Sequence, residues 1–188
     1  MSEAPIDHEV IPRYEPGVAG WVHLAASEIH ELAATIPQFG RYVEIGSASG
    51  ASAAMLADAR PDLSIVCVDI FVGDLHEGNP DGHWSRSRRW IVNRRPNMNL
   101  WVGTIHEFAR ASFAPFHAAL VDAGHEYAEC LSDLCDVQGL LLPGAVLFAH
   151  DYQCPEYPGV QQAVDEFRAA NGWRLERVVH RLAVMVRG

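Results

Sequence analysis

Short apolar runs alternate along the chain with segments whose apolar residues recur at helical spacing. Strands are expected at RYVEIG (41–46), SIVCVDIF (64–71), NLWVGT (99–104), FHAALVDA (116–123) and GAVLFAHD (144–151). Helices are expected between and after these runs, at 51–59, 84–95, 105–111, 126–142 and 160–170. Strands that alternate with helices predict an α/β sheet built from right-handed crossovers.

The two ends of the chain complete this pattern. A helix at about 21–36 should open the fold, and the tail WRLERVVHRLAVMVRG is typical of two strands joined by a tight turn. The last strand would then run antiparallel to its neighbour. Runs such as ALV and AVLFA are apolar on both faces, as in parallel strands that helices cover on both sides. We therefore expect a seven-stranded, mostly parallel sheet with an antiparallel last strand and helices on both faces.

Length and composition indicate a single domain. The 188 residues suffice for one substantial core, with an N-terminal arm at 1–19, a leading helix at 20–39 and the core at 40–188. The net charge of -10 argues against binding a nucleic-acid backbone. No apolar run approaches the roughly 20 residues that span a bilayer. The acidic start MSEAPIDHEV lacks the basic and apolar regions of a signal peptide, so a cytoplasmic location is expected.

Residue usage narrows the chemistry further. The four cysteines, at 67, 130, 135 and 154, form no CxxC pair and show no zinc-ligand spacing, so reduced thiols are expected. All 14 basic residues are arginine. Lysine is therefore absent from every mechanism considered below.

The stretch YVEIGSASG, at 42–50, ends a strand on the acid Glu44 and continues in a turn of small residues: Gly46, Ser47, Ala48, Ser49 and Gly50. In an open α/β sheet, ligands bind beyond the carboxyl ends of the strands, where the strand order reverses. The two glycines allow a tight turn, and the residues between them leave room for a ligand. The pattern E-x-G-x-x-x-G differs from the dinucleotide turn G-x-G-x-x-G. Its acid is placed to meet a cationic or hydrogen-bond-donating part of a cofactor; a turn with only a structural role is the alternative.

A second acid ends the second strand. SIVCVDIF carries Asp69, 25 residues after Glu44. An acid at the end of strand two accepts hydrogen bonds from a ribose diol, although Asp is also common as a helix N-cap or turn residue. Together with the glycine turn, Asp69 favours a cofactor that contains a nucleoside.

Several segments, in this order, resemble class I S-adenosylmethionine-dependent methyltransferases: VEIGSASGAS, VDIF, LVDAGHEYAECLSDL, LLPGAVLFAHDY and PGVQQAVDEF. The resemblance is to the small-molecule O-methyltransferase branch, which includes catechol and macrolide-sugar methyltransferases. It covers about residues 40–188 and implies a Rossmann-like seven-stranded fold. It also implies that the acid and glycines of the turn line the methionine end of S-adenosylmethionine, that Asp69 holds the ribose, and that 103–105 lies near the adenine. The expected cofactor site comprises Glu44, Gly46, Ser47, Ser49, Gly50, Asp69, Ile70, Thr104 and Asp122.

Polar residues follow strands four and five. DAGHEY carries Asp122 and His125, and HDY carries His150 and Asp151. The strand ends should bring these side chains together, and such ligands hold Mg2+, Mn2+, Fe2+ or Zn2+. A metal there would lower the pKa of a coordinated hydroxyl. A helix cap at Asp122 and a hydrogen-bonded strand end at His150 are the alternatives.

The resemblance supports this chemistry in part. Metal-dependent relatives place one Asp after strand four and an acidic or amide pair after strand five. Asp122 and Asp151 match, whereas His150 stands where a carboxylate is more usual; the metal site expected is Asp122, His150 and Asp151. Relatives of the catechol type use a lysine as base, which this chain lacks. His125 or His150 is therefore expected to take the acceptor's proton, since imidazole titrates near neutral pH.

Two loops lie on the same side as these strand ends. VGDLHEGNPDGHW follows strand two, and YQCPEYPG follows strand five. His83, Trp84 and Tyr152 are expected to contact a ring or sugar of the acceptor, with Tyr157 as a further candidate. Local packing of these aromatic residues is the alternative. Relatives often complete the pocket with a second subunit, so a homodimer is one expected state.

The sequence therefore predicts a methyltransferase that uses S-adenosylmethionine, acts on an oxygen of a small-molecule acceptor, and employs Mg2+ or another divalent metal. A nicotinamide-dependent oxidoreductase is the enzymatic alternative, although the acid and the extra residue in the turn count against it. A cofactor-binding protein without turnover would bind S-adenosylmethionine with no metal effect. A metal-dependent hydrolase or hydroxylase would bind metal without affinity for S-adenosylmethionine.

Overall fold

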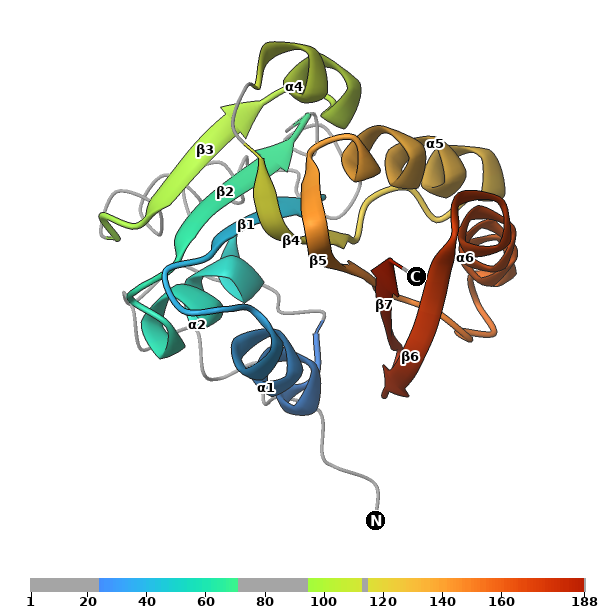
Figure 1. The fold of residues 1–188 in the computed structure, drawn as a ribbon, viewed down its shortest axis with the longest axis horizontal. Helices are drawn as coiled ribbons and strands as arrows, with labels where there is room; N and C mark the ends of the chain where they lie inside the picture. Colours follow the sequence, from blue (N-terminus) through green and yellow to red (C-terminus); the bar gives the residue numbers. More distant parts are fainter. Residues whose placement is uncertain (1–23, 71–94, 113–114, 188) are drawn as a thin grey trace, which may run out of the picture.

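A seven-stranded sheet crosses the described part of the protein in the order β3-β2-β1-β4-β5-β7-β6 (Figure 1). The computed structural model describes residues 24–70, 95–112 and 115–187. Strands β1 to β5 pair in parallel, and β7 runs antiparallel to both β5 and β6. The strands are β1 (Arg41–Ile45), β2 (Ser64–Asp69), β3 (Met98–Val102), β4 (Phe116–Val121), β5 (Leu141–Ala149), β6 (Trp173–Val179) and β7 (Leu182–Arg187). The predicted sheet, with its antiparallel last strand, is confirmed.

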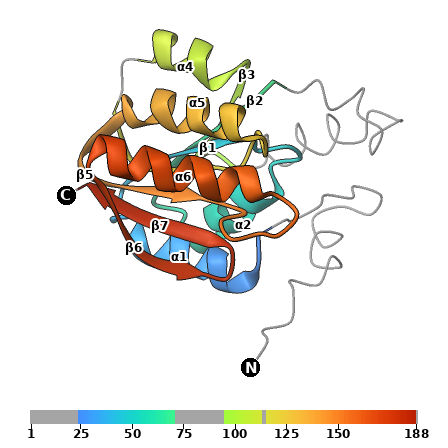
Figure 2. The same cartoon turned by 90° about the vertical axis from the view of Figure 1, so that its right-hand side faces the viewer.

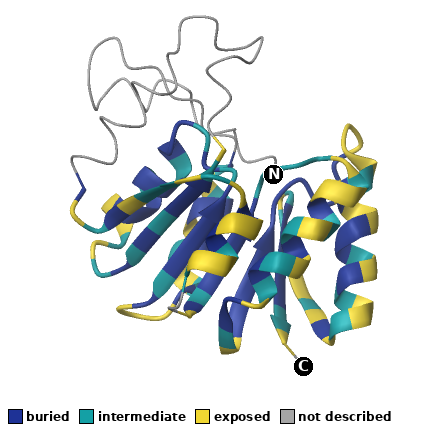
Figure 3. Cartoon of the chain, turned by 90° about the horizontal axis from the view of Figure 1, so that it is seen from above, coloured by how far each residue is buried: buried dark blue, intermediate teal, exposed yellow. Residues whose placement is uncertain are grey.

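Helices cover both faces of this sheet, as predicted (Figure 2). They are α1 (Ala26–Thr35), α2 (Ala51–Ala59), α4 (Ile105–Ala111), α5 (Tyr127–Gln138) and α6 (Pro158–Asn171). Helices α4, α5 and α6 share one apolar core with the sheet, and α1 and α2 share the other. Alternation along β1 shows the division, because Val43 belongs to the first core and Tyr42 to the second. The strands between the layers are largely buried (Figure 3).

One helix is shorter than its sequence pattern indicated. Helix α5 ends at Gln138 rather than at 142, and Gly139 caps it. The apolar residues that follow belong to β5, since Leu141 pairs with Phe116 of β4. Apolar periodicity alone does not separate the last turn of a helix from the first residues of a buried strand.

Other boundaries shift at the ends of elements. Strand β5 ends at Ala149, so His150 and Asp151 lie in a turn. Asp151 adopts a left-handed conformation there, with φ of 56°. Helix α1 begins at Ala26, and Leu24 and Ala25 precede it without helical structure.

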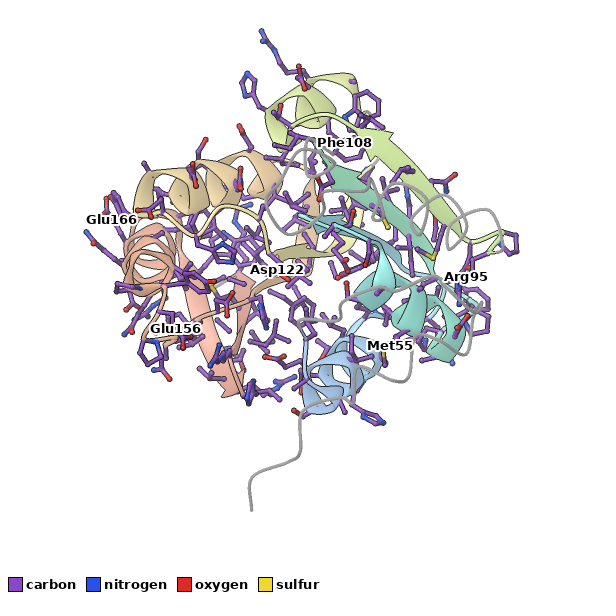
Figure 4. The ribbon with its side chains drawn as sticks, turned by 180° about the vertical axis from the view of Figure 1, so that it is seen from behind. Met55, Arg95, Phe108, Asp122, Glu156 and Glu166 are labelled. Atoms are coloured by element: carbon purple, nitrogen blue, oxygen red, sulfur yellow. The ribbon has the colours of Figure 1, made fainter. Side chains whose placement is uncertain are left out.

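The arm at 1–19 and most of the helix predicted at 84–95 lie outside the described residues. Arg95, the last residue of that predicted helix, is buried (labelled in Figure 4), and its guanidinium lies 2.7 Å from the carboxylate of Asp58. Among the helices that the structure describes, none has the length and apolar character needed to cross a bilayer.

Backbone hydrogen bonds continue past the strand ends and align the loops that follow. The N–H groups of Gly46, Asp122 and His150 donate to carbonyl groups near the ends of β2, β1 and β4, respectively. Because β1 lies between β2 and β4, the strand order reverses at β1, and ligands bind at such a point. The sheet itself therefore places these loops side by side.

Candidate active site

A pocket of about 860 Å³ opens beyond the carboxyl ends of the central strands. Its walls come from the turn after β1, the ends of β2 and β4, the start of α4, and the loop after β5. Figure 4 labels Asp122, which follows β4, and Glu156, which precedes α6. The acidic and basic residues in the pocket wall are Asp69, Asp122, His125, Glu129, Asp133, His150, Asp151, Glu156 and Arg181. This excess of carboxylates favours a ligand that carries positive charge.

The glycine turn has the tight conformation that its sequence predicts. Gly46 and Gly50 have φ of 84° and 78°, and Gly50 is the N-cap of α2. A Cβ on Gly46 would lie 2.0 Å from the carbonyl oxygen of Asp122, so the turn after β1 packs directly against the loop after β4. Gly46 and Ala48 line the pocket. The backbone of the turn can therefore approach a ligand closely.

Glu44, Ser47 and Ser49 lie in the protein interior, outside the set of pocket-lining residues. The carboxylate of Glu44 accepts hydrogen bonds from the hydroxyls of Tyr42 (3.0 Å) and Ser52 (2.6 Å). Burial raises the pKa of Glu44 to about 7, although both hydrogen bonds act in the opposite direction. Glu44 thus connects β1 to the first turn of α2, on either side of the glycine turn.

Residues expected at the ribose and adenine do line one end of the pocket. The carboxylate of Asp69 accepts a hydrogen bond of 2.7 Å from the N–H of Ala48, which connects β2 to the glycine turn. Ile70 is 50% exposed, and Thr104 caps α4 by accepting from the N–H of Glu107. Asp69, Ile70 and Thr104 thus lie together as predicted, but their contact with a cofactor stays a prediction.

The four polar residues after β4 and β5 form one cluster. His150 Nδ1 lies 3.1 Å from Asp122 Oδ1 and 3.4 Å from Asp151 Oδ2. His125 Nε2 lies 3.1 Å from Asp151 Oδ2. The strand ends therefore bring these side chains together, as the sequence predicted.

His150 is buried, with a carboxylate near each of its ring nitrogens. Its second ring nitrogen, Nε2, lies 3.4 Å from Glu28 Oε2, so both nitrogens face carboxylates. Burial alone would lower the pKa of His150, but the surrounding carboxylates outweigh it and raise that pKa well above its ordinary value. The group of possible metal ligands that the structure brings together contains His125 rather than His150, and the roles of His150 as base and as metal ligand stay predictions.

His125 has the better position for chemistry at the pocket wall. Its side chain is 40% exposed and stacks on Tyr157, with ring centroids 4.1 Å apart. Because a carboxylate only accepts, Nε2 donates to Asp151, and this hydrogen bond raises the pKa of His125 above its ordinary value. His150 and His125 in turn hold the pKa of Asp151 low, although its burial acts in the opposite direction.

Ligand atoms from Asp122, His125 and Asp151 lie within 4.8 Å of one another. Two carboxylates and one imidazole form a donor set that fits Mg2+, Mn2+, Fe2+ or Zn2+. His125 thus takes the place in the donor set that the sequence had suggested for His150.

Tyr152, expected to contact the acceptor, is not among the residues that line the pocket. It is buried (4% exposed), and its hydroxyl donates to Asp165 of α6 at 3.0 Å. Tyr157, five residues later, lines the pocket instead. His83 and Trp84 lie outside the described residues.

Three residues of the site were not predicted from the sequence: Glu28 and Arg181 at the cluster, and Asp133 in the pocket wall. Glu28 belongs to α1 and lies beside His150. Arg181 belongs to the turn between β6 and β7, and its guanidinium lies 3.6 Å from Asp151. Neither segment carries a motif that points to the strand ends. Asp133 of α5 lines the pocket, and burial raises its pKa to about 6. The sequence did hold a signal for Asp133: it lies one helical turn after Glu129, on the helix that follows DAGHE, so both acids share one helix face.

A family model for a methyltransferase domain matches residues 43–152, which is more than half of the chain. No curated protein matches the sequence at a significant level.

Solved structures share the fold at low sequence identity. NovP, an O-methyltransferase, has a TM-score of 0.67 and 17% identity over 88% of this chain and 81% of NovP. CalS11, the calicheamicin methyltransferase, has a TM-score of 0.63 and 17% identity over 86% of this chain and 76% of its own. Fibrillarin from Aeropyrum pernix, with natively bound S-adenosyl-L-methionine, has a TM-score of 0.60 and 16% identity over 85% of this chain and 72% of its own.

Proposed function

The chain belongs to the methyltransferase-domain family, and from this premise we propose that it transfers a methyl group from S-adenosylmethionine to an oxygen of a small-molecule acceptor. The observation that carries the proposal is the pocket at the reversal of strand order. There the glycine turn and Asp69 form one end, and His125 lies beside Asp122 and Asp151. Cofactor and acceptor sites are thus contiguous, as methyl transfer between two bound molecules requires.

The residues present fit S-adenosylmethionine. Asp69 offers a carboxylate for the ribose hydroxyls, and Thr104 and Ile105 offer a wall for the adenine. Of the glycine turn, only Gly46 and Ala48 line the pocket, so no side chain larger than a methyl group separates its backbone from a ligand. The sulfonium and amino groups of this cofactor are cationic, which matches the acidic wall.

His125 is the residue proposed to take the acceptor's proton. Asp151 accepts the hydrogen of Nε2 and so fixes the ring, which stacks on Tyr157 at the pocket wall. A base held in this way contributes typically 10²–10⁴-fold to the rate. NovP is an O-methyltransferase and CalS11 is a TDP-rhamnose 3'-O-methyltransferase, and these similarities also favour O-methylation of a small molecule.

Asp122, His125 and Asp151 are the residues that would hold a divalent metal. When bound, such an ion lowers the pKa of an acceptor hydroxyl and neutralises charge that develops on its oxygen. One imidazole cannot bind a metal and take a proton at the same time, so metal ligand and base are alternative roles for His125. Chelation distinguishes them, because a base needs no metal.

Replacing Asp69 tests the proposed cofactor site. Asp69→Asn keeps an oxygen for the N–H of Ala48 but removes the charge offered to the ribose. Loss of hydrogen bonds to a charged group should weaken binding of S-adenosylhomocysteine roughly 10-fold to 100-fold, as measured by calorimetry. Asp136→Asn on α5, which changes an acid that pairs with His106, is the matched control. Unchanged affinity in Asp69→Asn would contradict the assignment of the ribose to β2.

A further inference from the structure

Glu28, in the first turn of α1, is a carboxylate with no exposed surface (0%). Its Oε2 accepts the N–H of Ala25 at 2.6 Å and caps the helix. Its Oε1 accepts the N–H of Arg181 at 2.9 Å, across 153 positions of sequence. One buried side chain therefore connects the start of α1 to the turn between β6 and β7.

The same carboxylate faces His150 of the active-site cluster. Glu28 Oε2 and His150 Nε2 are 3.4 Å apart, an ion-pair separation, and Nε2 has no hydrogen-bond partner among the described residues. On the other side of the ring, Nδ1 faces Asp122 and Asp151. The ring of His150 is thus held between a carboxylate of α1 and two carboxylates of the pocket.

Asp151 links this arrangement to His125. The Oδ2 atom that His150 Nδ1 approaches at 3.4 Å is the atom that accepts from His125 Nε2 at 3.1 Å. Rotation of the His150 ring would withdraw one of the contacts that hold Asp151, and the contacts with His125 and Arg181 would remain. Contacts therefore run from Glu28 through His150 and Asp151 to His125.

We propose that Glu28 is a positioning residue for the active site. It holds the ring of His150 with Nδ1 toward Asp122 and Asp151, and through Asp151 it fixes the ring of His125. The effect on catalysis rests on the proposed function, whereas the effect on the two histidine rings does not. Outer partners that orient site residues typically change activity 10-fold to 100-fold when removed.

A purely structural role as helix cap is the competing explanation, and α1 offers a matched control. Glu31, on the same helix, pairs with Arg177 of β6 and does not take part in the cluster. Glu31→Gln therefore removes one carboxylate from α1 and one contact with the same hairpin. It leaves His150 untouched.

Glu28→Gln keeps one side-chain oxygen, which can accept the N–H of Ala25 or that of Arg181 but not both, and it removes the charge that faces His150. In the full-length, ligand-free protein, we expect the ring nitrogen NMR signals of His150 and His125 to move by more than a linewidth. Glu31→Gln should leave both in place, and both variants should bind S-adenosylhomocysteine as the wild type does. With an acceptor that the wild type methylates, Glu28→Gln should lower kcat about 10-fold at unchanged KM for S-adenosylmethionine.

Unmoved His125 signals in a folded Glu28→Gln protein would overturn the proposal and leave Glu28 as a helix cap. Should that variant not fold, the wild type provides the test. A hydrogen on His150 Nε2, buried against Glu28, should give a slowly exchanging ring signal, assigned by its loss in His150→Gln. Its absence would overturn the proposal. Failure of the proposed function would appear separately, as absent binding of S-adenosylhomocysteine by the wild type.

Discussion

Gly46→Ala should destabilise the protein by about 3 kcal/mol and abolish binding of S-adenosylhomocysteine. A left-handed conformation costs a residue with a Cβ roughly 1–2 kcal/mol, and Gly46 has φ of 84°. The new methyl group would also lie 2.0 Å from the carbonyl oxygen of Asp122, where only backbone can give way. Forcing the loops after β1 and β4 apart adds roughly 1–3 kcal/mol and opens the site. Thermal unfolding should shift down by about 10 °C for a chain of this size.

Gly144→Ala separates the cost of the left-handed conformation from the cost of the close contact with Asp122. Gly144 has φ of 78°, similar to that of Gly46, but a Cβ there would meet nothing within 4 Å. This control should cost only about 1 kcal/mol and leave binding intact. Equal losses in the two variants would mean that the conformation alone matters. The close contact between the loops after β1 and β4 would then carry no weight in forming the site.

His125→Gln should reduce methyl transfer about 10²-fold to 10⁴-fold while S-adenosylhomocysteine still binds, because the ring proposed to take the acceptor's proton is lost. The amide can still donate to Asp151, so the cluster should keep its arrangement. The measurement is the rate at which S-adenosylhomocysteine forms with a phenol or sugar acceptor that the wild type methylates.

His106→Gln on α4 is the control for His125→Gln, since His106 is 61% exposed and pairs with Asp136 away from the cluster. It should retain wild-type rates. A His125→Gln protein with wild-type kcat would exclude His125 as base. If chelation then abolished that activity, the chemistry would belong to a metal at Asp122 and Asp151.

The fold was largely predictable because each of its elements has a local sequence signal. Apolar runs predict β1 to β5. Gly50 precedes α2 and Gly172 follows α6, and both have the positive φ that favours glycine at helix ends. The boundary between α5 and β5 was not predictable, since Leu141 and Leu142 satisfy either periodicity. Pairing of Leu141 with Phe116 of β4 determines where the strand begins, and a contact with another strand cannot be read from the local sequence.

The site was predictable where the sheet alone determines it. Gly46, Asp69 and Asp122 follow strand ends, so their meeting is a consequence of strand order. Side-chain directions were not predictable in this way. His150 turns inward because Glu28 arrives from α1, and the hydroxyl of Tyr152 finds Asp165 on α6. The direction of each of these side chains depends on a partner in another helix, and no local sequence pattern predicts that partner.

Calorimetric titration of the wild-type protein with S-adenosylhomocysteine, and separately with NAD+, tests the central claim most directly. Each titration is run after chelation and again with Mg2+, Mn2+ or Fe2+ restored. The account predicts micromolar binding of S-adenosylhomocysteine, about -8 kcal/mol, and no binding of NAD+. Binding of NAD+ instead, or of neither molecule, would contradict it.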